Sequence, residues 1–512
     1  MSQKRVLAEL INQLYTTNKN LLAMLGRYLV KKYNKTLVDI INDINITNQD
    51  IIEFFIEIPY EDPGFSLSLS HYLTNDPIFD DLLPPVSLDK NNAIENILIS
   101  HKNYILDESN SLELRYSLFY DLLIRMFQQN QGMSQLKEPY LKLLSEIQSQ
   151  TKIKEQTSSD TDRIFIFTNQ YLESPTHAPS NIVRVLTQQF EKIGLKVIVV
   201  SCTPVPFPLK LEFQNMQFNQ NTIQRGDVKE LYENSFIIEL SGNPLKENIF
   251  EDFCNGLQLN NNDTFILVGE RCIQFDILPF KNKFHFPTGT SSSISTAKYL
   301  IADRDFNLYN TKGEKLELIK CPNDFTLEKD VEFSPPIKED IEKLCKIVIV
   351  GNRLNAEIDE TLWDELVKLS KKISAIKIFI VGEFDINHVP ENIKEMVNCV
   401  GFQDNLKQFL VDKHFYINPK RNGGGQSSLF ALKVGVPVIS TNFGDVAHLM
   451  KHQNCIDSYN QITDFVVQYI EDKNFKDKID TYNKSLLTNP EELLDGMNVM
   501  CKSILEYSGV EV

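Results

Sequence analysis

Residues 418–428 are Asn-Pro-Lys-Arg-Asn-Gly-Gly-Gly-Gln-Ser-Ser, and this segment carries the clearest fold signal in the chain. The apolar run Phe415-Tyr-Ile precedes it, and Leu429-Phe-Ala-Leu-Lys-Val follows it. Gly435 and a second apolar run, Val436-Pro-Val-Ile-Ser, close the segment. This order is typical of a buried strand, a glycine loop, a helix and another buried strand. The segment therefore predicts an α/β domain in which a glycine loop opens a helix.

The glycine loop has the chemistry of a diphosphate site. The glycines at 423–425 carry no Cβ, so their backbone amides can approach a ligand closely. The N-terminus of the following helix favours anionic oxygens, and Ser427 or Ser428 is its expected cap. Lys420 and Arg421 add positive charge beside the loop. A flexible turn without a ligand is the alternative explanation of three consecutive glycines.

The α/β alternation extends over most of the chain. Apolar runs alternate with amphipathic helical patterns after about residue 151, and Phe333-Ser-Pro-Pro divides this region. We therefore predict two Rossmann-like domains, at 151–335 and 336–512. In tandem they would face a cleft at the carboxyl ends of both sheets, where ligands bind. The expected strands begin at Arg163, Leu195, Ser235, Thr264, Lys346, Ile376, Phe415 and Val436, and the expected helices span 181–193 and 360–372.

The first part of the chain has a helical spacing of apolar residues in place of the α/β alternation. Apolar residues recur there at helical spacing, as at Leu7, Leu10 and Leu14. We predict an all-α accessory domain at 1–150, and the polar stretch at 148–162 is its expected linker to the rest of the chain.

Composition excludes several classes of protein. The net charge of −17 argues against a general nucleic-acid binder, although a local basic site remains compatible with it. The N-terminus has no signal-peptide pattern, and the chain has no apolar run long enough for a membrane span. The eight cysteines form no Cys-x-x-Cys pair, as in reduced proteins. A cytoplasmic protein is expected.

The glycine segment resembles the donor site of GT-B glycosyltransferases, and most of all a bacterial variant with Asn-Pro-x-Arg-x-Gly-Gly-Gly. Val350-Gly-Asn-Arg-Leu resembles the Gly-Arg-Leu turn that opens the C-terminal domain of such enzymes. The loop at 168–180 resembles their Gln-x-Leu…His-Ala-Pro-Thr loop. An all-α region ahead of such a core is similar to adhesin-glycosylating N-glucosyltransferases. The resemblance covers about residues 160 to 512.

The resemblance implies a metal-independent glycosyltransferase that takes a nucleotide sugar, with UDP as the expected nucleotide, and a protein or glycan acceptor. His177 is expected to act as a catalytic base or to contact the transferred sugar. Thr288 lies in a hydroxyl-rich loop ahead of an expected helix from about Ile294. Asp303-Arg-Asp resembles a metal–diphosphate motif of another glycosyltransferase class, and we attribute it to chance. The expected substrate-binding residues are Arg353, Lys420, Arg421, Gly423, Gly424, Gly425, Gln426, Ser427, Thr288 and Asp445. A purely structural role is the alternative for each.

One departure from the family pattern leaves a second function open. Many retaining members carry two glutamates eight positions apart, and the second binds the ribose of the nucleotide. Asn422 and Phe430 occupy the matching positions here. Either another residue, such as Asp445, contacts the ribose, or the site has lost donor binding. In the second case the chain is a GT-B-like interaction or chaperone subunit, with the all-α domain as its surface for a protein partner.

Overall fold

The computed structural model describes residues 133–153, 163–173, 177–202, 228–240, 249–288, 294–322, 333–373, 375–421, 423–487 and 490–510, with scattered positions from 102 to 123. The predicted all-α domain therefore lies mostly outside the described residues. Its described end forms η1 (Met133–Leu136) and α9 (Lys137–Gln150). No helix in these ranges is long and apolar enough to cross a membrane.

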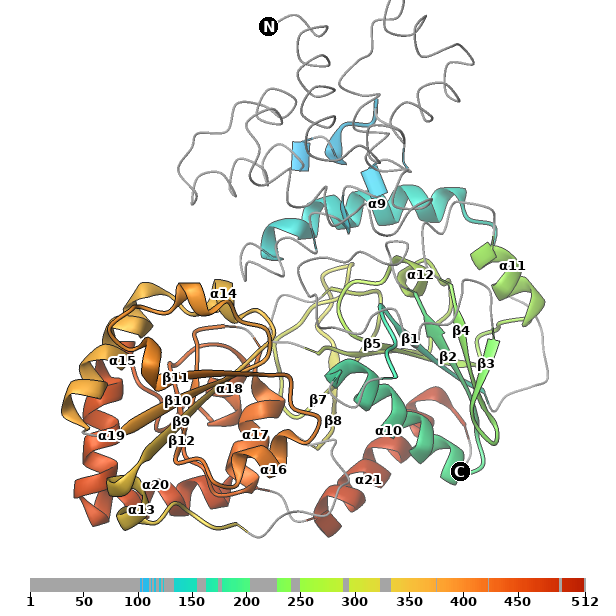
Figure 1. The fold of residues 1–512 in the computed structure, drawn as a ribbon. Helices are drawn as coiled ribbons and strands as arrows, with labels where there is room; N and C mark the ends of the chain where they lie inside the picture. The colour runs from blue at the N-terminus through green and yellow to red at the C-terminus, as the bar shows by residue number, and fades with distance from the viewer. Residues whose placement is uncertain are drawn as a thin grey trace, which may run out of the picture.

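The first α/β body is built on an eight-stranded sheet (Figure 1). Its strand order is β3-β4-β2-β1-β5-β6-β7-β8, and only the β3–β4 pair is antiparallel. From β4 to β7, the parallel strands follow the doubly wound order 3-2-1-4-5-6. In this order β1, β2 and β4 extend the sheet to one side, and β5, β6 and β7 extend it to the other, so the strand order changes direction between β1 and β5. The strands are β1 (Arg163–Thr168), β2 (Lys196–Ser201), β3 (Val228–Tyr232), β4 (Ser235–Glu239), β5 (Thr264–Val268), β6 (Lys283–Phe286), β7 (Tyr299–Ala302) and β8 (Glu317–Lys320).

The second body has a five-stranded parallel sheet of order β11-β10-β9-β12-β13. This is again the doubly wound arrangement, 3-2-1-4-5, and the strand order changes direction between β9 and β12. The strands are β9 (Cys345–Val350), β10 (Ile376–Val381), β11 (Val397–Gly401), β12 (Phe415–Asn418) and β13 (Val438–Ser440). The predicted α/β fold with two Rossmann-like domains is confirmed. A ligand cleft between the two bodies stays a prediction.

Helices cover both sheets because each has one apolar face. In α15, for example, Leu362, Leu366 and Leu369 are fully buried, and Asp359 caps the helix by accepting a hydrogen bond from the Leu362 amide at 2.9 Å. The helices after α9 are α10 (Ala178–Lys192), α11 (Ile249–Gly256), α12 (Ile273–Asp276), α13 (Lys338–Lys343), α14 (Leu354–Glu357), α15 (Glu360–Lys372), η2 (Ile386–His388), η3 (Lys394–Met396), α16 (Leu406–Leu410), α17 (Gly425–Lys433), α18 (Gly444–Leu449), η4 (Tyr459–Gln461), α19 (Ile462–Glu471), α20 (Lys473–Ser485) and α21 (Pro490–Ser508).

Both ends of the described chain pack on the first body. Tyr140 of α9 lies in the same apolar cluster as Phe165 of β1 and Phe265 of β5. The last helix, α21, returns from the second body, so that Ile504 joins the cluster around Val183 of α10 (Figure 1). The predicted boundary placed α21 with the second domain, whereas its buried face belongs to the first.

The prediction of a helix from about Ile294 is wrong. Residues 294–298 are irregular, and β7 begins at Tyr299. The four residues of β7 are all buried, and β7 lies between two parallel neighbours, β6 and β8. A run this short has no periodicity that separates a helix from a buried strand, so pairing in the sheet decides it.

Candidate functional site

The glycine segment lies at the point where the strand order of the second sheet changes direction, between β9 and β12. The chain leaves β9 at Val350 and β12 at Asn418, and these are the neighbouring strands on either side of that point. The loops that follow are 351–353 and 419–424, and they lie at the carboxyl edge of the sheet. Ligands of doubly wound proteins bind at this place. The fold therefore brings together two segments that the sequence analysis singled out separately.

Gly424 starts α17 in a conformation that other residues rarely adopt. It is the N-cap residue, with φ of +96°. An added Cβ would lie 2.5 Å from Asn418 Oδ1 and 2.7 Å from Arg421 Nη2. The predicted cap by Ser427 or Ser428 is wrong, because the helix already begins at Gly425 and has no side-chain cap. The first turn of α17 therefore starts within the glycines themselves.

The Ser427 hydroxyl supports the first turn from inside the helix. It donates to the Gly424 carbonyl at 3.1 Å and shares a 2.7 Å hydrogen bond with the Tyr416 hydroxyl. Tyr416 comes from β12, so the start of α17 is fixed to the strand that precedes the glycine loop. Gln426 lies beside it in the same turn and is half-buried.

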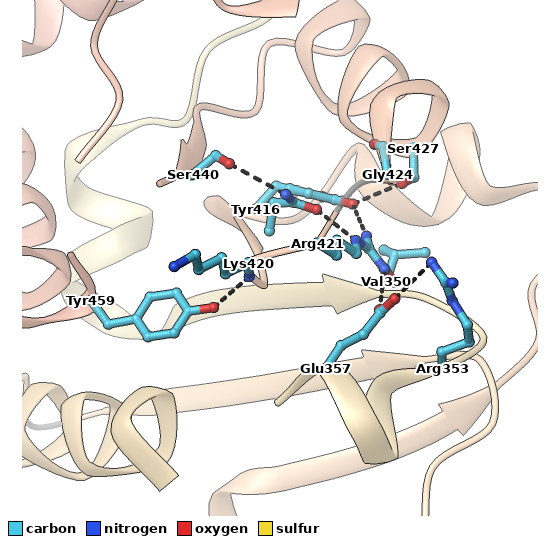
Figure 2. A network of polar contacts seen from close by, with 11 residues as sticks. Val350, Arg353, Glu357, Tyr416, Lys420, Arg421, Gly424, Ser427, Ser440 and Tyr459 are labelled. Carbon is cyan, nitrogen blue, oxygen red and sulfur yellow. Dashed lines mark hydrogen bonds and ion pairs between the residues drawn. The ribbon is translucent and has the colours of Figure 1, made fainter. Parts of the chain in front are cut away.

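Arg421 is buried inside the site and is only 4% exposed. Its guanidinium donates to Asn418 Oδ1 at 2.9 Å, to Glu357 Oε2 at 2.8 Å and to the Val350 carbonyl at 2.6 Å (Figure 2). Burial opposes the charge, but contacts with Tyr416 and Glu357 raise the pKa of Arg421. We predicted Arg421 as a charge presented to phosphate, whereas the structure uses its donors to join the two strand ends.

Glu357 lies between two arginines. One oxygen pairs with Arg421, and the other lies 3.0 Å from an Arg353 Nη2 nitrogen (Figure 2). The pKa of Arg353 is lowered by burial, although Glu357 opposes the shift. Sequence reasoning missed Glu357, whose only signal was its position four residues after Arg353, on the same face of a helix.

Arg353 and Asp445 flank the glycine loop. A Cβ built on Gly423 would lie 3.6 Å from Arg353 Nη2, and one built on Gly425 would lie 3.5 Å from Asp445 Cβ. Asp445 lies in the first turn of α18, and its charge acts on Arg353. The structure thus brings these predicted residues, which are far apart in the sequence, to one place.

Lys420 has a different environment from its neighbour Arg421. Its side chain is exposed, and Nζ lies 5.6 Å from the ring centre of Phe443. Its backbone amide donates to the Tyr459 hydroxyl (Figure 2). Lys420 therefore has a fixed backbone and a charge that remains available to a ligand.

His177 precedes α10 in the first body. Its Nδ1 lies 2.6 Å from the Ser180 hydroxyl, which accepts a hydrogen bond from the Leu172 amide at 2.8 Å. Burial, and the charge of Arg184 next to it, lower the pKa of His177 to about 4. An imidazole with this pKa is neutral near pH 7 but is a poor proton acceptor. Both predicted roles, a catalytic base and a polar contact to the sugar, stay predictions.

The other sequence candidates have ordinary surroundings. Thr288 is half-buried and directly precedes residues outside the described ranges. Asp303 pairs with Arg304 at 3.4 Å, and Asp305 pairs with Lys315 at 2.5 Å. Within the described ranges no group of three or more His, Cys, Asp or Glu side chains could hold a metal ion.

Phe430 lies on α17 and is half-buried in the apolar cluster of the second body. The Lys407 ammonium lies 6.0 Å from the centre of its ring. Asn422, the other position that departs from the family pattern, lies outside the described residues. The phenyl ring at 430 packs in this apolar cluster and has no atom that accepts a hydrogen bond as a carboxylate does.

No protein-family model matches the chain, and no curated protein matches it. Among solved structures, a mutant O-GlcNAc transferase from Thermobaculum terrenum is 12% identical and has a TM-score of 0.48, over 96% of this chain and 99% of that one. WaaG, a glycosyltransferase involved in lipopolysaccharide biosynthesis, is 10% identical, with a TM-score of 0.41 over 65% of this chain and 98% of that one. An α,α-trehalose-phosphate synthase (UDP-forming) from Burkholderia vietnamiensis is 7% identical, with a TM-score of 0.44 over 69% and 99%. Likenesses this distant establish neither activity nor substrate.

Proposed function

We propose that this chain is a cytoplasmic glycosyltransferase that moves a sugar from a nucleotide-sugar donor, UDP-linked, to a protein or glycan acceptor. The observation that carries the proposal is the start of α17. Three glycines open a helix N-terminus between β12 and β13, where the strand order of a doubly wound sheet changes direction. Arg353 lies beside Gly423, and Lys420 belongs to the loop that leads into the glycines. Backbone amides without Cβ atoms in front of them, together with positive charge, suit a diphosphate.

The three basic residues of the site have different proposed roles. Arg421 is fully engaged with the protein and holds the loop in shape, so it supplies little free charge. Lys420 is exposed and supplies charge to the ligand. Arg353 shares Glu357 and reaches the glycine loop, where it would contact a phosphate or the ribose.

The proposed reaction depends on stabilising the leaving nucleoside diphosphate. As the glycosidic bond of the donor breaks and the sugar bonds to the acceptor, negative charge grows on the leaving diphosphate, which takes up the proton that the acceptor loses, and the amides at the start of α17 would stabilise that charge. Lys420 adds a mobile cation to the same charge. His177, neutral at physiological pH, would hold a hydroxyl of the sugar or acceptor from the first body. No step of this proposal uses a metal.

Calorimetric titration with UDP-, GDP- and dTDP-sugars tests the proposal. We expect one donor to bind, and Lys420→Ala to weaken that binding about tenfold through loss of a charge-assisted contact. Lys371→Ala is the matched control, because Lys371 is an exposed lysine at the end of α15. A wild-type protein that binds none of these donors would refute the proposal.

The second candidate function is a catalytically inactive subunit of GT-B type, acting through a protein partner at the N-terminal region. Phe430 is the observation that favours it, since a phenyl ring cannot accept a hydrogen bond from a ribose hydroxyl. Release of nucleoside diphosphate from a bound donor separates the two functions. Turnover supports the transferase, and the absence of donor binding, or donor binding without hydrolysis or transfer, supports the inactive subunit.

A further inference from the structure

Two histidines at the end of α18 are hydrogen-bonded to each other. His448 belongs to the last turn of this helix, and His452 follows in the next turn of the chain. The Nε2 atom of His452 lies 2.7 Å from the Nδ1 atom of His448, and its Nδ1 atom lies 2.6 Å from Asn442 Oδ1. The amide oxygen of Asn442 can only accept, so His452 donates to it through Nδ1. While His452 is uncharged, its Nε2 atom therefore accepts the hydrogen bond from His448.

The backbone after α18 has an unusual conformation that brings His452 back to His448. Five described residues other than glycine have positive φ, and three of them, Lys451, His452 and Asn454, lie in this turn, with φ of +48°, +56° and +57°. The amide of His452 donates to the Ala447 carbonyl at 2.7 Å, which closes the turn on the helix. Left-handed backbone costs free energy at residues other than glycine, and such strain is concentrated where a fold needs a side chain in a particular place.

The first of these histidines, His448, meets the first body. Phe306 lies in the loop after β7, and the centre of its ring is 6.5 Å from that of His448, with 89° between the two planes. This is an edge-to-face contact between aromatic rings. Arg304, from the same loop, lies over the phenyl ring with Cζ 4.7 Å from its centre. Phe306 also packs against the apolar cluster around Leu300 of β7, so the loop is fixed to the first body.

The charges around His448 come from both bodies. Among the described residues, three titratable side chains act on it: His452 from its own turn, and Asp303 and Arg304 from the loop of the first body. Burial, Arg304 and His452 lower the pKa of His448, and only Asp303 opposes the shift. A proton on His448 therefore places a positive charge against Arg304 across the contact. A proton on both rings would put hydrogens on both facing nitrogens, which lie 2.7 Å apart.

The direction of the pKa shift decides how pH acts on this contact. When the two bodies separate, Arg304 moves away from His448, and the pKa of His448 returns towards its ordinary value of 6.5. The separated state then binds more protons than the joined state does. The contact is therefore favoured above pH 6.5 and loses stability as the pH falls below that value.

We propose that the His448–His452 pair is a proton-sensitive contact between the two bodies: it holds the Phe306 loop against α18 while both rings are uncharged, and it releases the loop in acid. This inference goes beyond the proposed function and involves no donor. The same helix, α18, carries Asp445, which flanks the glycine loop. The contact therefore controls where the first body lies relative to the helix beside the candidate site.

Small-angle X-ray scattering of the full chain without ligand, at pH 7 and pH 5, tests the contact across the range in which histidine titrates. We expect the radius of gyration of wild type to increase at pH 5, because the two bodies separate. His448→Gln and Arg304→Gln should each keep the same radius at both pH values, since neither variant brings two positive charges together. His388→Gln, which removes an exposed histidine from η2, is the matched control and should expand as wild type does.

Far-ultraviolet circular dichroism of each sample distinguishes separation of folded bodies from unfolding, which would also increase the radius. A wild-type radius that is the same at both pH values overturns the proposal, as does expansion of either glutamine variant at 448 or 304 to the extent seen in wild type. A variant that is already expanded at pH 7 overturns it too, because the side chain would then join the bodies without regard to its charge. None of these results depends on donor binding, so the proposed function is tested separately by its own titration.

Discussion

Arg421 and Glu357 form a buried ion pair across the candidate site, with 2.8 Å between Nη1 and Oε2 and only 4% of each side chain exposed. Glu357 ends α14, after β9, and Arg421 lies in the loop after β12. The pair therefore joins the two loops at the reversal point of the sheet. Buried charges of this kind are stable only when both partners are present.

Glu357→Gln should destabilise the protein and loosen the glycine loop. The substitution removes the charge that compensates the Arg421 guanidinium, which remains buried with neutral partners only. We expect the free energy of unfolding to fall by about 3 kcal/mol, measured by urea denaturation. Glu360→Gln, an exposed glutamate at the start of α15, is the control and should change little. Equal stability of the two variants would contradict the role given to Glu357.

The sequence predicted the local parts of the site, and the fold decided how they are used. Three consecutive glycines between an apolar strand and a helix are a local signal, so the loop and α17 could be predicted. The environment of Arg421 could not, because Val350 and Glu357 reach it only after β9 and β12 pair.

Acid should weaken the protein through His177. Its folded pKa, about 4, lies below the ordinary value of 6.5, because burial favours the neutral ring. Its contribution to stability is therefore complete above pH 6.5 and is lost as the pH falls from 6.5 towards 4, where the unfolded chain binds a proton that the folded chain does not.

The measurement compares the free energy of unfolding at pH 7 and pH 5. We expect wild type to lose more stability over this interval than His177→Gln does, while exposed His388→Gln should follow wild type. Parallel losses in wild type and His177→Gln would show that the histidine is not held neutral.

Tyr140→Phe should weaken the attachment of α9 to the first body. The Tyr140 hydroxyl donates to Asp276, whose other oxygen accepts from the Thr296 amide at 2.6 Å. Tyr140 and Asp276 are fully buried, so the lost donor leaves an acceptor unpaired. We expect a loss of about 1–3 kcal/mol in urea denaturation. Tyr309→Phe, at an exposed position, is the control, and an equal effect there would show that α9 does not depend on this bond.

Gly382→Ala should damage both stability and donor binding. The backbone at Gly382 has a φ of +112°, which alanine rarely adopts. An added Cβ would also lie 1.9 Å from the Gly351 carbonyl oxygen. Gly269→Ala is the matched control, because φ there is +130° and nothing lies within 4 Å of an added Cβ. We expect about 1 kcal/mol of destabilisation for Gly269→Ala from backbone strain alone. For Gly382→Ala we expect about 3 kcal/mol or more, since the 351–353 loop has to move. Because that loop carries Arg353, donor affinity should fall only in Gly382→Ala. Equal stability and equal donor affinity in the two variants would show that the contact between the loops does not shape the site.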